Sequence, residues 1–448
     1  MGCKIDANLD RLEAKKAKKD VYRNISYLSI LRMVNYGLPL VTLPYLVLTL
    51  GAEMFGLISF AQAVIQYCNI IVDFGFNLSA TRDISIHREN QAKVAEIVSS
   101  VLTMKLVLMI GVFLVWCGMI FLIPKFKAYW MIYLVTYGLV VGDGLFPLWF
   151  FQGLEKMQYL TVLNAAAKII FTVLIFLVVK DKADYLLVPL VNSFGQVIID
   201  IIALYIVFKK FQVRVIIPQY TILKHYTLDS FQLFLSRVWL SLYTVANTVI
   251  LGFATSNELT GYYAVAEKLI RALEGLVQPL IDALYPYMAR SQNKMFIKNI
   301  IQRLTIVNVV FISMVFCCSD YICIILFGKL FLASAVIFKI YLVEVVITIP
   351  SALFGLPFLV AFGYYKWFNA SNCLGFIGYI LGVLIISIDF TAEKLVIIAV
   401  LAQSIVLVHR IYGIYKFDLW PKKRDINCEK FYRKTNNKFL WLYSKYND

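Results

Sequence analysis

The sequence predicts an all-α integral membrane protein of about twelve transmembrane helices in two six-helix bundles related by pseudo-twofold symmetry. The first observation is composition, because 61% of the 448 residues are hydrophobic and 16% are charged, outside the range of soluble proteins. The second is that apolar runs long enough to cross a bilayer recur throughout the chain. The third is an internal repeat that relates the two halves.

The apolar runs define the predicted spans and the order of the chain. The first set is 24–49, 55–79, 99–123, 128–151, 159–179 and 185–208, and the second is 228–253, 258–281, 304–327, 331–361, 367–388 and 393–415. We therefore expect bundles at 24–208 and 228–415, a linker at 209–227, a basic N-terminus at 1–23 and a basic, aromatic tail at 416–448. Lysine and arginine concentrate in the segments on the side of both termini, which predicts cytoplasmic termini.

The repeat is clearest in the charged stretch 261–282. At 100° per residue, five polar positions of this stretch share one side of a helix. A shift of 205 residues places Glu267, Arg271, Glu274, Gln278 and Asp282 on Gln62, Gln66, Asn69, Asp73 and Asn77, and also Gly261 on Gly56 and Arg237 on Arg32. A second match, at an offset of 210, relates 147–156 to 357–366 through a shared P-x5-G-x2-K pattern. One duplication explains both matches.

The charged side of this stretch predicts a water-filled pathway. A charge in lipid costs about 3 kcal/mol or more, so the side with Glu267, Lys268, Arg271 and Glu274 should face other helices or water. The alternative is that Glu267 and Arg271 neutralise each other as an i, i+4 pair in a helix that merely packs. Four charges within eight residues favour the pathway.

Several function classes lack their usual signatures. The eight cysteines form no CxxC pair, and the chain carries no HExxH, GxSxG or glycine-rich phosphate loop. We therefore expect no catalytic residues, no metal site and no cofactor. The tail beyond residue 416 alternates basic and aromatic residues, and directly after a span this pattern favours anionic membrane lipids over nucleic acid.

Other charges within the spans have simpler interpretations. Lys168 and Asp200 are expected to pair with each other, and Lys105 is expected to snorkel toward the interface. Asp143, between two glycines, is either a proton or sodium site or a hydrogen-bonded structural aspartate. The run 149–151, Trp-Phe-Phe, is expected to belong to an interfacial aromatic belt, with stacking against a sugar as the alternative.

Four features together resemble a known family: the twelve spans in two halves, Arg32 with LGAEMFGLISFAQA, WFFQGLEKM at the end of the fourth span, and LGFATSNELTGYYAVAEKLIR in the second half. Residues 20 to 415 resemble the polysaccharide-transport flippases of the multidrug/oligosaccharidyl-lipid/polysaccharide exporter superfamily, whose fold is that of the MATE transporters, and in particular the O-antigen and capsule repeat-unit flippases. The resemblance implies translocation of undecaprenyl-diphosphate-linked oligosaccharide to the outer leaflet of the bacterial inner membrane by alternating access.

The cationic residues are the candidate contacts for a diphosphate. Arg32 and Arg237 occupy matched places deep in spans one and seven, and arginine supplies permanently charged, multidentate donors. They are either substrate contacts or structural partners of Asp73 or Glu274. The predicted substrate-binding set is Arg32, Arg237, Lys268 and Arg271, and the predicted polar or coupling set is Gln62, Gln66, Asn69, Asp73, Asp143, Glu267 and Glu274.

Two rival functions compete with the flippase. A multidrug exporter that exchanges cations for protons or sodium should have an acidic lumen, whereas basic residues slightly outnumber acidic ones here. A membrane glycosyltransferase or polysaccharide polymerase should carry a large outer loop, and the outer connections are short. We therefore expect a transporter and not an enzyme. Its expected partners are the lipid-linked oligosaccharide, anionic lipids, H+ or Na+ as coupling ion, and a polymerase with its chain-length machinery.

Overall fold

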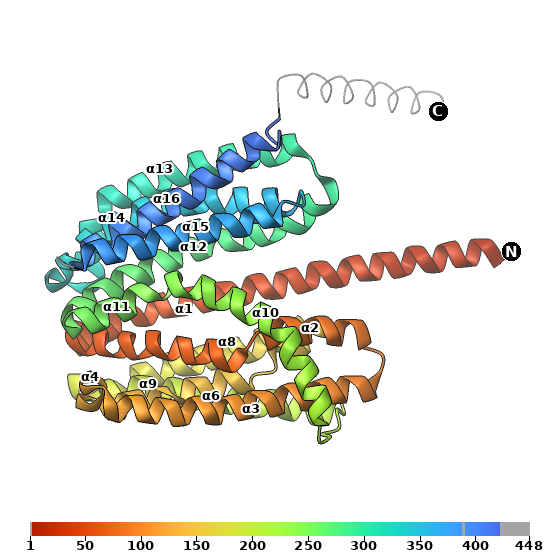
Figure 1. Ribbon diagram of the computed structural model, residues 1–448, viewed down its shortest axis with the longest axis horizontal. Coiled ribbons are helices and arrows are strands. Elements are labelled where there is room, and N and C mark those ends of the chain that lie inside the picture. The colour runs from red at the N-terminus through yellow and green to blue at the C-terminus, as the bar shows by residue number, and fades with distance from the viewer. Residues whose placement is uncertain (1, 388–389, 422–448) are drawn as a thin grey trace. The chain divides into compact units, whose positions relative to one another are not determined.

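Almost all of the described chain is helical, with short connections between the helices (Figure 1). A computed structural model describes the backbone of residues 2–387 and 390–421. Within these ranges it describes the side chains of 34–35, 37–224, 226–231, 233–235, 238, 241, 245–281, 284–285, 287–387 and 390–421. Over the described backbone there is no β-strand, so the predicted all-α class is confirmed.

The first predicted bundle folds as a run of helices. Their bounds are α1 Gly2–Asp73, α2 Phe76–His87, α3 Gln91–Leu122, α4 Pro124–Ala128, α5 Trp130–Thr136, α6 Gly138–Leu145, α7 Leu148–Gly153, α8 Met157–Val178, η1 Lys182–Leu186, α9 Leu187–Tyr205 and η2 Ile206–Lys210. α1 covers the first predicted span and most of the second, and α5 to α7 together form the fourth. The fourth span is interrupted after Leu145, where Phe146 and Pro147 leave the helical conformation.

The second predicted bundle is also a run of helices. Its elements are α10 Tyr220–Thr244, α11 Ala246–Ala254, α12 Asn257–Ser291, α13 Lys294–Phe327, η3 Lys329–Phe331, α14 Leu332–Phe354, η4 Gly355–Val360, α15 Tyr365–Ile386 and α16 Ala392–Lys416. α10 with α11 forms the seventh predicted span, and α12 contains the eighth. The predicted boundaries of the two bundles and of the linker between them remain predictions.

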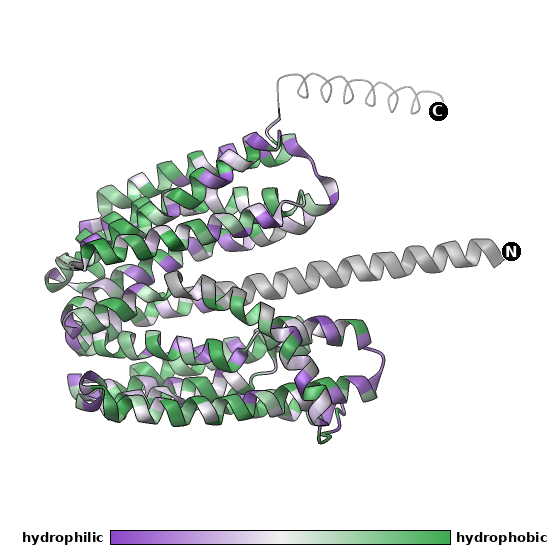
Figure 2. Cartoon of the chain, viewed as in Figure 1, coloured by the Kyte–Doolittle hydropathy of each residue, from purple (hydrophilic) through white to green (hydrophobic). Residues whose placement is uncertain are grey.

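Among the described residues, nine helical stretches are long and apolar enough to cross a membrane. The first two predicted spans count as one stretch, Gly37–His87, and α10 to α12 are not among the nine. α12 carries the charged side predicted from the sequence, and these charges make it too polar to count as an apolar span. Exposed Val107, Ile110 and Leu114 show that α3 turns an apolar face outward, and apolar residues dominate its length (Figure 2).

A glycine separates the first two predicted spans. At Gly51 the backbone has a φ of 76°, in the left-handed region that glycine adopts without a steric penalty. The helical path therefore kinks between the end of the first predicted span and the start of the second. The second span then ends at Asp73, and Gly75, with a φ of 80°, turns the chain into α2.

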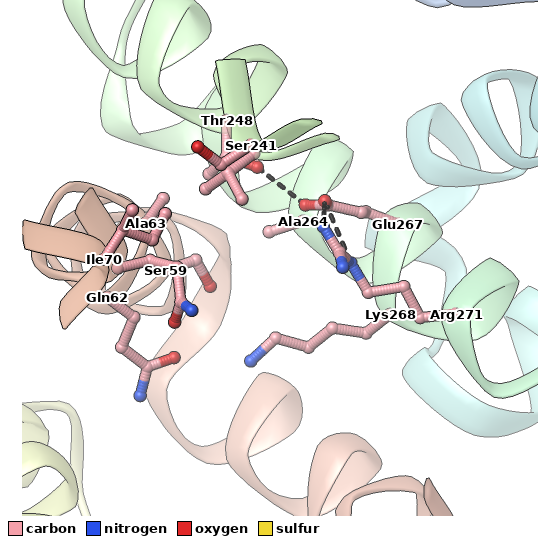
Figure 3. Close-up of a pocket in the computed structure, with 12 residues that line it drawn as sticks. Ser59, Gln62, Ala63, Ile70, Ser241, Thr248, Ala264, Glu267, Lys268 and Arg271 are labelled. Atoms are coloured by element: carbon pink, nitrogen blue, oxygen red, sulfur yellow. Dashed lines mark hydrogen bonds and ion pairs between the residues drawn. The ribbon is translucent and has the colours of Figure 1, made fainter. Parts of the chain in front are cut away.

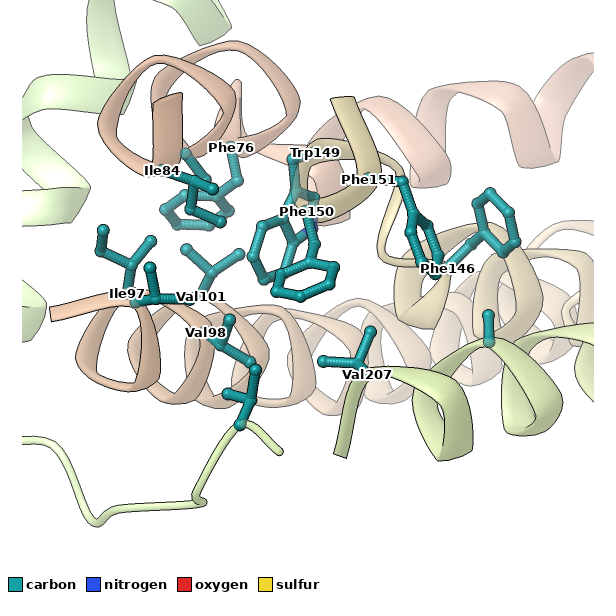
Figure 4. Close-up of a cluster of buried hydrophobic side chains, with 14 of the residues drawn as sticks. Phe76, Ile84, Ile97, Val98, Val101, Phe146, Trp149, Phe150, Phe151 and Val207 are labelled. Carbon is teal, nitrogen blue, oxygen red and sulfur yellow. The ribbon is translucent and has the colours of Figure 1, made fainter. Parts of the chain in front are cut away.

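Aromatic and aliphatic side chains from α2, α3, α7 and α8 form the core at one end of the first bundle (Figure 4). Trp149, Phe150 and Phe151 are fully buried there, with no exposed surface. The expected interfacial belt is therefore wrong for these three residues. Because α7 follows an interruption in the fourth span, it can turn these rings against α2 instead of toward the bilayer surface.

Two glycines matched by the predicted duplication, Gly56 and Gly261, lie where α1 and α12 are in contact. A Cβ on Gly56 would lie 1.8 Å from the carbonyl oxygen of Asn257, and a Cβ on Gly261 would lie 2.0 Å from that of Ala52. The two glycines matched by the 205-residue shift thus stand at one contact, backbone against backbone. A side chain at either position would force the helices apart.

The described chain divides into two compact units. One comprises residues up to Leu276 with Cys318–Tyr341 and Ile385–Ile397, and it contains both cavities described below. The other contains Val277–Cys317, Leu342–Leu384 and the described residues from Ile398.

In the second unit the guanidinium of Arg410 is buried. It donates to the carbonyl oxygen of Ser351 and to Oδ1 of Asn372, both at 2.7 Å, and lies 4.6 Å from the ring centre of Phe368. These contacts join α14, α15 and α16. Arg410 therefore ties three helices of this unit together.

Candidate functional site

A cavity of about 580 Å³ lies between α1, α10, α11 and α12 (Figure 3). Five predicted site residues line it, namely Gln62, Gln66, Glu267, Lys268 and Arg271. The remaining lining residues are Ser59, Ala63, Ile70, Ser241, Val245, Thr248 and Ala264. The cavity therefore brings the polar sides of the two matched helices to one space, which we call the central cavity.

The acidic residue of this cavity is already engaged. Arg271 donates to Oε1 of Glu267 from Nε at 3.1 Å and from Nη2 at 2.6 Å, and Thr248 donates to Oε2 at 2.6 Å. The expected i, i+4 pair therefore exists, and both carboxylate oxygens have partners. Arg271 nevertheless keeps 48% of its side chain exposed, while Glu267 keeps 15%. The pair consequently presents its cationic partner to the cavity.

Lys268 contributes a second cation. Its ammonium lies 4.9 Å from the ring centre of Phe55, close enough for a cation–π interaction. Phe55 belongs to α1 and is 2% exposed, so Lys268 reaches from α12 across to the other matched helix (Figure 3). An aromatic ring stabilises the ammonium without neutralising it, which leaves the positive charge available to a ligand.

The α1 wall of the central cavity carries amides. Gln62 and Gln66 stand one helical turn apart, and the Gln66 side chain is exposed. Amide groups both donate and accept hydrogen bonds, so this wall can bind hydroxyl groups without a charge of its own. Cations on one wall and amides on the other suit a ligand that combines phosphate with sugar.

A second cavity, of about 310 Å³, lies within the first bundle, and we call it the bundle cavity. Its lining includes the predicted residues Gln66, Asn69, Asp73 and Asp143, together with Asn35, Ile70, Asn77, Gly144, Phe146, Leu148, Asn164 and Gln196. Gln66 and Ile70 line both cavities, so the two spaces adjoin at α1. The predicted polar set therefore separates into two groups.

Lys105 occupies a different place from the one expected. Its side chain is 1% exposed, and its ammonium lies 3.5 Å from Oδ1 of Asp73 and 3.5 Å from Oδ1 of Asn77. The prediction that it snorkels to the interface is wrong, because a carboxylate and an amide from neighbouring helices supply its polar partners inside the bundle. Lys105 on α3 thereby forms an ion pair with Asp73 on α1.

The predicted pair of Lys168 and Asp200 does not form. Asp200 is fully buried, and within the described structure neither of its carboxylate oxygens has a hydrogen-bond partner. Lys168 acts electrostatically on Asp143 instead. Asp143 is exposed to the bundle cavity and accepts a hydrogen bond of 2.8 Å from Nδ2 of Asn69.

Three further candidates lie away from the cavity linings or beyond the described side chains. Glu274 is partly buried on α12 and lines neither cavity, although it lies within electrostatic range of Arg271 and Glu267. Arg32 and Arg237 fall on α1 and α10, but their side chains are outside the part of the structure that is described. Their assignment as substrate contacts stays a prediction.

Some residues of the site escaped the sequence analysis. Phe55 and Thr248 contact charged groups of α12, but an aromatic or a threonine in an apolar span gives no signal of its own. Asn164 and Gln196 line the bundle cavity and did carry a signal, since each is an amide within a predicted span. A search for isolated amides in apolar runs would have found them.

Comparison with known proteins places this geometry in context. The sequence profile of a family described as "Polysaccharide biosynthesis protein" matches residues 21–292. A protein of Escherichia coli (strain K12) named "Putative O-antigen transporter" is 33% identical over 269 residues, which are 60% of this chain and 65% of that protein. A protein of the same name from Shigella dysenteriae is 30% identical over 60% of this chain and 67% of its own length.

Solved structures share the fold at low sequence identity. A structure titled "Lipid II flippase MurJ, inward closed conformation" has a TM-score of 0.73 at 11% identity and covers 88% of this chain and 87% of its own. An inward-facing multidrug resistance MATE transporter of the MOP superfamily has a TM-score of 0.61 at 12% identity and covers 88% and 98%. These likenesses confirm the predicted fold class.

Proposed function

Because the chain belongs to the family of polysaccharide biosynthesis proteins, we propose that it is a flippase for oligosaccharide repeat units carried on undecaprenyl diphosphate. The cargo would move from the cytoplasmic to the outer leaflet of the bacterial inner membrane for O-antigen, capsule or exopolysaccharide synthesis. The match covers 65% of the Escherichia coli relative, so the activity is proposed here on the chain's own site. The proposal rests chiefly on the central cavity, which has Lys268 and Arg271 on its wall.

The chemistry of the cavity supports an anionic headgroup. Charge-assisted hydrogen bonds to phosphate contribute about 1.5–3 kcal/mol each, more than neutral ones. Arg271 holds Glu267 through Nε and Nη2 while 48% of its side chain stays exposed, so the guanidinium is accessible to a ligand in the cavity. Lys268 adds three donors above the Phe55 ring. In a space surrounded by apolar helices these cations are weakly screened, which strengthens their attraction for a diphosphate.

The amide wall supports a sugar beside the phosphate. Gln62 and Gln66 line the central cavity together with the two cations, and Gln62 lies on the α1 side of it (Figure 3). The long polyprenyl tail would stay in the bilayer while the headgroup passes through the central cavity, by the alternating access that the family resemblance implies. Arg32 and Arg237 would add cationic contacts along the same path.

The state of Glu267 argues against the multidrug exporter. A cation-binding lumen needs a carboxylate free to receive the drug, and Glu267 has both oxygens engaged by Arg271 and Thr248. Glu267 is the acidic residue in the central cavity lining, where two basic residues accompany it. The coupling ion of the proposed transport, H+ or Na+, would then bind elsewhere, and Asp143 in the bundle cavity is the candidate for it.

Binding of undecaprenyl diphosphate to the purified protein tests the proposal. We expect Arg271→Ala to weaken binding about 10- to 100-fold, as the loss of one or two charge-assisted hydrogen bonds implies, and Arg271→Lys to keep part of it. Lys127→Ala serves as the control, since Lys127 is exposed in the short α4. Inorganic pyrophosphate should compete in wild type. Unchanged binding in the alanine variant at normal folded yield would remove Arg271 from the site.

Transport in vesicles tests the step that follows binding. Cysteines that replace Gln66 and Arg271, which line the same cavity, can be joined by a bifunctional thiol reagent of suitable length. We expect the crosslink to stop flipping of a labelled undecaprenyl-diphosphate sugar and cleavage of the linker to restore it. Efficient crosslinking with undiminished flipping would show that the two helices do not separate, and alternating access would have to be abandoned.

A further inference from the structure

The bundle cavity and the helices around it contain more acidic than basic side chains. The acids are Asp73 on α1, Asp143 on α6 and Asp200 on α9, and the bases are Lys105 on α3 and Lys168 on α8. Among the side chains that the structure describes in this bundle, these five charged groups act on one another. With all five ionised, they would together carry one excess negative charge inside the membrane-spanning bundle.

Two of the three acids have a compensating partner. Asp73 receives the ammonium of Lys105 at 3.5 Å. Asp143 accepts a hydrogen bond from Asn69 at 2.8 Å, faces the bundle cavity and lies within electrostatic range of Lys168. Lys105 thus forms its ion pair with Asp73, and Lys168 acts on Asp143, whereas Asp200 receives only a longer-range influence from Lys105.

Asp200 is the remaining acid, and its surroundings do not suit an anion. It is 0% exposed, and neither oxygen makes a hydrogen bond of good geometry in the described structure, although the amide of Gln196 lies beside it as a neutral polar neighbour. Gly142 also lies close, since a Cβ on Gly142 would lie 3.1 Å from Oδ2 of Asp200 and 2.4 Å from Cγ of Gln196. An isolated carboxylate in such a place is far more costly than a neutral carboxylic acid.

We propose that the first bundle binds one proton on the pair Asp200 and Asp143, with Asp200 as the carboxyl that holds it and Asp143 as the group that exchanges it with the bundle cavity. Gln196 links the two places, because it packs beside Gly142 next to Asp200 and also lines the cavity that Asp143 faces. The bound proton cancels the excess negative charge. Its transfer to Asp143 leaves Asp200 as the buried anion, a state that the present packing of α6 against α9 does not stabilise.

The proton site acts as a switch. Loss of the proton favours any arrangement of α6, α8 and α9 that brings Lys168 or water to Asp200. Gln66 and Ile70 on α1 line both cavities, so such a rearrangement moves residues of the central cavity as well. The proton site depends only on the residues of this bundle, and its existence does not require the proposed cargo.

Substitution by asparagine distinguishes a neutral aspartate from a charged one. Asparagine has the shape of a protonated carboxyl, so Asp200→Asn in the purified full-length protein should leave the melting temperature near pH 7 within about 2 °C of wild type. Asp73→Asn is the matched comparison, because it leaves the buried Lys105 without its carboxylate and should lower the melting temperature clearly. An equally large drop for Asp200→Asn would show that Asp200 is an anion and would overturn the proposal.

Infrared spectroscopy tests for the proton directly. A protonated carboxyl has a C=O stretch well separated from that of a carboxylate, and we expect such a band near pH 7 in wild type and in Asp320→Asn, but not in Asp200→Asn. Asp320 is a suitable control because it is paired with Lys339 at 2.7 Å outside this bundle. If all three proteins lack the band, or all three keep it, Asp200 does not carry the proton.

Sodium provides the remaining discrimination. The melting temperature should depend less on pH in Asp200→Asn than in wild type. Replacing K+ by Na+ at fixed ionic strength should leave the melting temperatures of both proteins unchanged. A stabilisation by Na+ that Asp200→Asn abolishes would assign the site to a metal cation and overturn the proton. These measurements use no lipid-linked cargo, so their outcome is separate from that of the proposed flippase activity.

Discussion

The two matched helices, α1 beyond its kink and α12, carry polar residues at the same positions but place their charges differently. At the first three matched positions α1 has the amides Gln62, Gln66 and Asn69, whereas α12 has the charges Glu267, Arg271 and Glu274. At the fourth matched position the charge is on α1 and the amide on α12, because Asp73 corresponds to Gln278. The duplication therefore preserved polarity and not charge.

The difference shows how each helix tolerates its charges in an apolar setting. On α12, Glu267 and Arg271 compensate each other, and Lys268 lies over a ring supplied by α1. On α1, the acid turns toward the first bundle and pairs with Lys105. Amides need no such compensation, so Gln62 and Gln66 can face the central cavity alone. The result is a cavity with one cationic and one neutral wall.

The largest effect is expected where the two helices touch. Gly56→Ala would place a methyl group 1.8 Å from the carbonyl oxygen of Asn257, so the backbones must move apart and the free energy of unfolding should fall by about 1–3 kcal/mol or more. Gly261→Ala should behave alike because its contact is the counterpart. Thermal unfolding measures both, with Gly118→Ala as control, since nothing lies within 4 Å of its added Cβ. Equal stability of all three variants would contradict the close approach.

The next largest effect is expected from moving the positive charge of Arg271 from α12 to α1. We expect Arg271→Gln alone to weaken binding of undecaprenyl diphosphate about 10-fold or more. Adding Gln66→Arg moves the guanidinium to the matched position on α1, which lines the same cavity, and should restore part of the affinity. Equilibrium binding to the purified variants provides the measurement. If the double variant binds no better than Arg271→Gln, the two walls are not interchangeable, and the cationic wall is specific to α12.

A smaller effect is expected from neutralising the acid of the central cavity. Glu267→Gln removes the carboxylate that Arg271 and Thr248 share, and because Arg271 is half exposed the loss of stability should be about 1 kcal/mol or less. Affinity for inorganic pyrophosphate should rise, since the guanidinium loses its competitor. Gln62→Glu, which introduces an acid on the opposite wall, should lower that affinity. A fall in affinity for Glu267→Gln would mean that the carboxylate positions Arg271 for binding.

The sequence predicted the helical class, the spans and the residues of the central cavity, because these follow from hydropathy, helical periodicity and the cost of charge in lipid. It could not predict which polar residues face which cavity. Asn69 and Asp73 belong to the same helical side as Gln62 and Gln66, yet they line the bundle cavity instead. Only the packing of α3, α6 and α9 around α1 decides that separation.

The errors share a physical cause. The position along a span predicts an interfacial or paired role for Lys105, Asp200 and Trp149, but other helices set the surroundings of all three. Lys105 finds Asp73 on α1, Asp200 lies next to Gly142 and Gln196, and the break after Leu145 turns Trp149 into the core. A periodic pattern gives the face of a residue. It does not give the residue that the face will meet.

The smallest expected effect concerns the contact that joins the two matched helices through a charge. Phe55→Leu keeps an apolar side chain but removes the ring beneath the Lys268 ammonium, 4.9 Å away, and a cation–π interaction contributes about 0.5–2 kcal/mol. We expect Phe55→Leu to lose about 1 kcal/mol less stability when Lys268→Met is already present than in the wild-type background, as a double-mutant cycle would show, because only the packing part of the loss then remains. Equal losses in both backgrounds would mean that Phe55 acts only through apolar packing. In that case Lys268 would depend on the ligand itself for compensation, and its substitution should affect binding more than stability.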